Sequence, residues 1–200
     1  MMPDGSVVVG AEGGRRLFRL GPDGKPMTPL ALPDFLQNLP GNEGVEALAA
    51  LPGGALLAVS EGAYTGSGLV VAGHLEGKGA IRLAVAAPDN FRPTGADAAG
   101  GMLFLLQRRL SLLGGLQARI VAVPLNRFAH PREGMEIDGH ELARLGAGSF
   151  AENFEGIAVR RAADGRYLVY LVVDDNFSAL QRTLLLQFAW HPPGVATADY

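Results

Sequence analysis

Carboxylate and amide side chains that could bind a cation gather at several places along the sequence. The set comprises Glu43, Glu46, Glu61, Glu155, Asp174, Asp175 and Asn176, with Asn42 and Asn153 beside them. Oxygen ligands of this kind suit hard cations, and carboxylates brought together repel one another unless a cation lies between them. We therefore predict that the seven residues from Glu43 to Asn176 in this set bind Ca²⁺. We also predict that Glu43, Glu155 and Asp174 are catalytic, one of them as the base for a metal-bound water.

Each acidic residue taken singly has a simpler explanation, because such side chains at strand ends commonly form turns or remain solvated. Considered together they favour a function. Glu43 and Glu155 each precede a glycine and a hydrophobic residue, in the runs Asn42-Glu43-Gly44-Val45-Glu46 and Asn153-Phe154-Glu155-Gly156-Ile157. The same polar cluster in separate parts of a chain indicates a repeated loop that faces a shared site.

Arginines form a second group of candidates. Arg108 and Arg109 end an apolar run, and Arg182 lies near a later one. A guanidinium group binds phosphate or carboxylate through two parallel hydrogen bonds, so these three residues are predicted to hold an anionic substrate. The alternative is that they pair with carboxylates inside the fold.

Several classes of chemistry are excluded or find no support. The sequence contains no cysteine, no G-x-S-x-G and no nucleotide-binding glycine motif, and its four histidines are scattered. The net charge of −3 without a basic run argues against nucleic-acid binding. No apolar stretch reaches the roughly 18 residues of a membrane span, and no signal peptide is visible at Met1.

The elements that must position these residues are short strands joined by turns. A Gly-, Asp- or Pro-rich turn followed by an apolar run and a polar end recurs at Gly5, Gly54, Gly101 and Gly165. The first three lie about 50 residues apart, the length of a propeller blade. The last step is longer, so we predict an inter-blade insertion at residues 126–149, from Asn126 to Ser149. Only the stretch from Asp34 to Leu39 suggests a short helix.

This pattern predicts an all-β fold, and within it a β-propeller with about four recognisable blades in a single domain over residues 1–200. The alternative is a β-sandwich, which also has short strands and Gly/Pro turns. The chain opens directly on a turn, and an unclosed propeller exposes strand edges. We therefore expect it to be part of a larger propeller that has further N-terminal blades.

Four ordered blocks resemble the phytase-like domain family known as "esterase-like activity of phytase". The first runs from Leu39 to Ala49 and continues at Leu56–Gly62. The second is Pro93-Thr94-Gly95-Ala96, with Arg108-Arg109 and Gly114–Ile120. The third and fourth are Asn153–Val159 and Asp174–Leu185.

The resemblance implies a bacterial, periplasmic or secreted propeller whose Glu and Asp positions serve phosphoester or ester hydrolysis. We therefore expect a Ca²⁺-dependent hydrolase of phosphate esters that acts on a small anionic substrate. A hydrolase of carboxyl esters or lactones is an alternative on the same funnel. The alternative from another class is a non-catalytic propeller that binds a ligand or partner. The sequence does not indicate the oligomeric state, and without a signal peptide a cytoplasmic location stays open.

Overall fold

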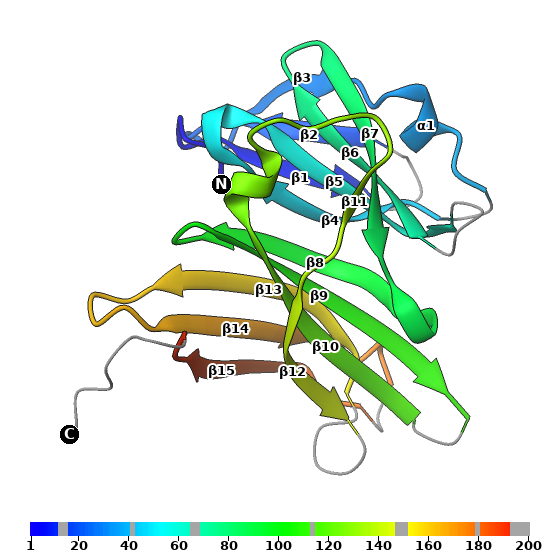
Figure 1. Cartoon of the computed structure of the whole chain (residues 1–200), viewed down its shortest axis with the longest axis vertical. Helices are drawn as coiled ribbons and strands as arrows, with labels where there is room; N and C mark the ends of the chain where they lie inside the picture. Colours follow the sequence, from blue (N-terminus) through cyan, green and yellow to red (C-terminus); the bar gives the residue numbers. More distant parts are fainter. Residues whose placement is uncertain are drawn as a thin grey trace.

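The computed structural model of the chain confirms the all-β class (Figure 1). It describes residues 1–11, 16–40, 43–64, 69–112, 115–146, 152–178 and 181–192. These residues form four β-sheets, the short helix α1 (Asp34–Gln37) and the 3₁₀ turns η1 (Pro52–Gly54), η2 (Pro88–Asn90) and η3 (Leu125–Phe128). None of the described helices is long and apolar enough to cross a bilayer.

Each sheet is built mainly from strands that follow one another in the chain. The first contains β1 (Val7–Ala11), β2 (Arg16–Leu20) and β3 (Pro26–Leu30). The second contains β4 (Val45–Ala50), β5 (Leu56–Tyr64), β6 (Leu69–Glu76) and β7 (Gly79–Ala86). The third contains β8 (Arg92–Ala99), β9 (Met102–Ser111), β10 (Gly115–Pro124) and β12 (His140–Gly146). The fourth contains β13 (Phe154–Arg161), β14 (Tyr167–Val173) and β15 (Leu184–Trp190).

The repeated turns lie where the sequence places them. Gly5, Gly54, Gly101 and Gly165 all have positive φ, a conformation that glycine adopts without a steric penalty. In the second, third and fourth sheets the turn joins the first two strands, whereas in the first sheet it precedes β1. The repeat read from the sequence is therefore a repeat of structure.

The segment from Asn126 onward contributes to two sheets. Strand β11 (Met135–Ile137) pairs in parallel with β7 at the edge of the second sheet. Strand β12 pairs antiparallel with β10 as the last strand of the third sheet. Residues 147–149 of the predicted insertion lie outside the described residues, and its description as an insertion stays a prediction.

Consecutive sheets pack face to face and divide the core among them. Along β9, Leu103 and Leu105 belong to the cluster shared with the second sheet. Phe104 and Leu106, between and beside them, belong to the cluster shared with the fourth. Successive side chains of a strand point to opposite faces, so an inner sheet needs apolar residues at every position. Strand β15 in the last sheet instead alternates between partly buried and exposed residues.

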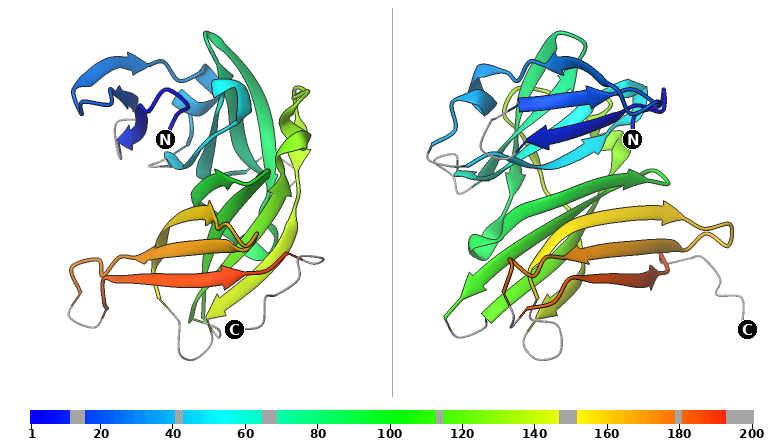
Figure 2. Two further views of the ribbon diagram at one scale, coloured as in Figure 1. Left: turned by 90° about the vertical axis from the view of Figure 1, so that its left-hand side faces the viewer. Right: turned by 180° about the vertical axis from the view of Figure 1, so that it is seen from behind.

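The sheets follow one another in chain order along an arc that does not close within the described chain (Figure 2, left). We call β4, β8 and β13 the leading strands, because each is the first strand of its sheet in the chain. They contact one another in succession along this arc. Propeller architecture, which requires a closed ring, is not established by this arrangement. The leading strands of consecutive sheets nevertheless lie next to one another.

Candidate functional site

A β-bulge lies near the start of the leading strand in three sheets. The register of β4 against β5 passes from Val45 directly to Ala47, which leaves Glu46 as the extra residue. In β8 the extra residue is Thr94. In β13 it is Glu155. A bulge releases one residue from the ladder and redirects its side chain, and bulges are common beside active sites.

A second set of equivalent residues lies on the neighbouring strands, one position beyond the partner of the residue that precedes each bulge. Ser60 pairs with Val45, Gln107 with Pro93 and Val173 with Phe154, and the residues that come next are Glu61, Arg108 and Asp174. Both sets line one cavity of about 500 Å³. Each of the three sheets thus contributes one bulge residue and one residue of the neighbouring chain segment to the same space.

Arg108 is the counter-charge within this cavity. Its Nη1 donates a hydrogen bond of 2.7 Å to Oε1 of Glu155, and its Nη2 lies 3.9 Å from Oε1 of Glu61. Burial raises the pKa of Glu155, Arg108 lowers it, and the charges of Asp174 and Glu61 raise it further. The net effect is an upward shift, which makes this carboxylate a stronger base and suits it to proton transfer.

Close packing of β8 against β13 holds Glu155 in place. The Thr94 hydroxyl donates a hydrogen bond of 3.1 Å to the carbonyl of Phe154. A side chain at Gly95 would stand only 3.1 Å from the Ile157 nitrogen, so glycine permits this approach. The Asp97 carboxylate accepts a hydrogen bond of 2.7 Å from the Val159 N–H. The bulge that carries Glu155 is therefore braced by its neighbouring sheet.

A second cavity of about 620 Å³ adjoins the first and shares Glu61, Arg108 and Asn176 with it. Arg92 and Arg109 also line this second cavity. The two spaces differ in charge, because the first is lined by four carboxylates and one arginine, and the second by three arginines and one carboxylate. We call them the acidic cavity and the cationic cavity.

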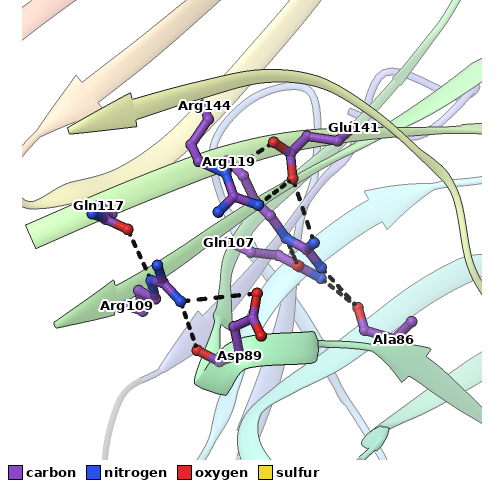
Figure 3. Close-up of polar contacts among 8 residues, drawn as sticks. All are labelled: Ala86, Asp89, Gln107, Arg109, Gln117, Arg119, Glu141 and Arg144. Carbon is purple, nitrogen blue, oxygen red and sulfur yellow. Dashed lines mark hydrogen bonds and ion pairs between the residues drawn. The ribbon is translucent and has the colours of Figure 1, made fainter. Parts of the chain in front are cut away.

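Arg109 also takes part in an arginine network on the third sheet (Figure 3). Its Nε donates to Gln117 at 2.9 Å, while Arg144 pairs with Glu141 at 2.8 Å and buried Arg119 donates to Gln107 at 2.7 Å. The Cζ atoms of Arg109, Arg119 and Arg144 lie 4.7, 5.0 and 5.2 Å from the ring centroid of buried Phe91. This network fixes the position of Arg109 by cation–π contact and hydrogen bonding.

The sequence matches the family described as "Phytase-like: Esterase-like activity of phytase" over residues 1–177. The chain belongs to this family. Among solved structures it is similar to a protein of unknown function from Bacteroides caccae, with 15% identity and a TM-score of 0.47. That match covers 94% of this chain, which spans 58% of the length of the other. No curated protein matches. The family description suggests a hydrolase-type function.

The phytase-like chain brings together six of the residues that the sequence singles out. Glu46, Glu61, Arg108, Glu155, Asp174 and Asn176 all line the acidic cavity. Their roles remain predictions, but their convergence from three sheets is a feature of the structure.

Glu43, Asp175 and Arg182 lie elsewhere. The Glu43 carboxylate lies against Gly62, where a Cβ would come within 2.8 Å of Oε1, and its buried Oε2 has no hydrogen-bond partner among the described residues. Asp175 accepts hydrogen bonds from Phe177 N–H and the Thr183 hydroxyl, so it organises its own loop. Arg182 pairs with Glu152 at 2.7 Å. Asn42 lies outside the described residues.

Two residues of this site were not singled out from the sequence, Thr94 and Arg92 of β8. Thr94 does precede a glycine, as Glu155 does, and this dipeptide was the available signal. Arg92 stands directly opposite Arg108 in the β8–β9 register, which no pattern in the sequence indicates.

The phytase-like chain does not present a ready metal site in its described part. No three His, Asp or Glu side chains there lie together as a group that could hold a metal ion. Arg108, close to both Glu155 and Glu61, supplies the positive charge that calcium would bring. The described residues therefore do not form a preformed calcium site. Calcium binding stays a prediction, as does export.

Proposed function

We propose that this phytase-like protein hydrolyses an ester bond at Glu155 and Arg108, with phosphate esters as the favoured class. The observation that carries the proposal is the geometry of Glu155. This partly buried carboxylate has a raised pKa, lies 2.7 Å from one guanidinium group and faces a cavity of about 500 Å³. Functional sites commonly combine burial and a charged partner in this way.

The proposed reaction uses Glu155 as a proton shuttle. The carboxylate takes a proton from a water molecule, whose oxygen forms a bond to the phosphorus while the phosphorus–oxygen bond of the ester breaks. The same carboxyl group then gives that proton to the oxygen of the departing alcohol. Arg108 stabilises the negative charge that develops on the phosphoryl oxygens. Burial raises the pKa of Glu155, and the charges of Asp174 and Glu61 add to this effect.

We also infer that the sheets are consecutive blades of a β-propeller. The meander order within each sheet and the contacts between β4, β8 and β13 support this inference. The leading strands would then be the innermost strands, and the acidic cavity would lie on the propeller axis.

Hydrolysis of an uncharged carboxyl ester is a second candidate function, and the charge of the acidic cavity favours it. Glu46, Glu61, Glu155 and Asp174 outnumber the single Arg108 there, and this excess repels a phosphate dianion but not a neutral ester. Turnover of an aryl phosphate compared with that of an aryl acetate distinguishes phosphoester hydrolysis from carboxyl-ester hydrolysis.

The test compares wild type with Glu155→Gln on both substrates. Gln keeps the size of the side chain but cannot accept the proton, so turnover should fall about a hundredfold or more. Glu136→Gln, at the exposed position of β11, is the matched control and should keep full activity. The melting temperatures of both variants check that the fold is kept.

Unchanged turnover in Glu155→Gln would remove this residue from the reaction. Absence of turnover of either ester by wild type, with and without added Ca²⁺, would favour a binding protein. Loss of activity on chelation, restored by Ca²⁺, would instead support the calcium prediction.

A further inference from the structure

We propose that the cationic cavity binds the phosphoryl group of the substrate and that Arg92 is an anion-binding residue of this site. The inference rests on the proposed function, because it specifies where the substrate of that reaction lies. It assigns the phosphoryl group to the space lined by Arg92, Arg108 and Arg109, and leaves the alcohol portion to the acidic cavity.

The charges of the two cavities support this orientation. An anion placed among the four carboxylates of the acidic cavity would be repelled, whereas three arginines against Glu61 attract it in the cationic cavity. Arg108 lines both, so a phosphoryl group bound there can contact the guanidinium group that also holds Glu155. The scissile bond would then lie at the wall that the cavities share.

The register of β8 against β9 supplies an independent reason. Arg92 and Arg108 are direct cross-strand partners. Like charges in this position destabilise a sheet unless a counter-charge lies near. Arg108 has two carboxylate partners, Glu155 and Glu61. Arg92 has the Glu43 carboxylate beside it, since Arg92 Nη1 and Glu43 Oε1 both lie against Gly62, but the two side chains form no ion pair in the described structure. An anion bound between the two arginines would relieve their repulsion.

A third observation concerns Asn153, which lines the cationic cavity and is only 2% exposed. Its side chain lowers the pKa of Glu155 by hydrogen bonding, and beyond this contact its buried Nδ2 has no partner in the described structure. An amide nitrogen carries two donors, and a buried donor left unpaired is costly and rare in folded proteins. A phosphoryl oxygen is an acceptor that would satisfy it.

The experiment is calorimetric titration of the protein with inorganic phosphate and, separately, with acetate. Wild type should bind phosphate more tightly than acetate. Arg92→Gln should raise the Kd for phosphate about tenfold, because it removes a charge-assisted hydrogen bond. Arg92→Lys should recover part of this loss. Lys78→Gln, in the β6–β7 turn, also removes one positive charge but should bind phosphate as wild type does.

Equal phosphate affinity in wild type and Arg92→Gln would overturn the proposal, and so would acetate binding as tight as phosphate binding. Arg92 is exposed at the surface, so the variant should fold normally. These results do not depend on turnover. Phosphate binding that requires Arg92, without hydrolysis of any ester, would support this binding site and contradict the proposed function. Hydrolysis of aryl phosphate with the same KM in wild type and Arg92→Gln would support the proposed function and contradict the binding role of Arg92.

Discussion

Glu155 illustrates how one side chain can be prepared for proton transfer by its surroundings. Burial disfavours its charged form, and Arg108 favours that form. The neighbouring carboxylates of Asp174 and Glu61 also disfavour the charged form. The result is a raised pKa in a group that still has a hydrogen-bonded cation 2.7 Å away. At the residue scale, the site depends on this balance.

The balance predicts the pH dependence of activity. As a base, Glu155 must be deprotonated, so kcat/KM should rise as the pH passes its pKa, which is raised from the ordinary glutamate value mainly by burial. Arg108→Gln removes the largest influence that lowers this pKa, so the acidic limb of the residual activity should move to higher pH. The pH–rate profile measures this, with Arg127→Gln, at an exposed position of η3, as the control. A limb that stays in place or moves to lower pH would contradict the proposed role of Glu155.

The tight turns are the elements that join each leading strand to the next strand of its sheet. Gly100 and Gly53 both have positive φ, but their surroundings differ. A Cβ at Gly100 would come within 2.8 Å of the Tyr167 hydroxyl, which itself donates a hydrogen bond of 2.7 Å to the Gly100 carbonyl. A Cβ at Gly53 would meet nothing within 4 Å.

This difference predicts two levels of destabilisation. Gly53→Ala should lower the free energy of unfolding by about 1–2 kcal/mol, the cost of an L-residue in the left-handed conformation. Gly100→Ala should cost more, because the same strain adds to a clash with a buried tyrosine. Urea denaturation of the two variants side by side measures the difference. Equal losses would show that the Tyr167 contact does not constrain the turn.

At the scale of the whole molecule, stability comes from sheets that cover one another. The second and third sheets are each buried on both faces, and their clusters join them to the sheets before and after. A sheet of this kind cannot bury its apolar faces alone. Polar bonds between leading strands, such as that of Asp97 with Val159, join neighbouring sheets at the site.

Asp97 therefore provides a test of sheet-to-sheet coupling. Asp97→Ala leaves the Val159 N–H without its acceptor, and the free energy of unfolding should fall by about 1–3 kcal/mol. Asp138→Ala, at an exposed loop position, should change it by no more than about 0.5 kcal/mol. Urea midpoints measure both. If Asp97→Ala proves as mild as the control, the bond does not hold the third sheet to the fourth.

The amino-acid sequence by itself determined the fold class and the repeated turns. Glycines that need positive φ and apolar runs such as Met102–Leu106 are local signals, and local physics suffices to interpret them. Strand β8 carries a weak sequence signal, because Pro93, Gly95 and three alanines give it little apolar or β-branched character. Strands β11 and β12 lie in the segment predicted as an insertion.

Only the tertiary structure decided which side chains meet. Glu43 and Glu155 have similar neighbours in the sequence, yet the bulge in the second sheet selects Glu46 for the cavity, and that in the third selects Thr94. The pairing of Arg92 with Arg108 likewise depends on the register of two strands. A bulge or a shift of one residue reverses the direction of a side chain in a strand, and that choice is made by contacts between distant segments.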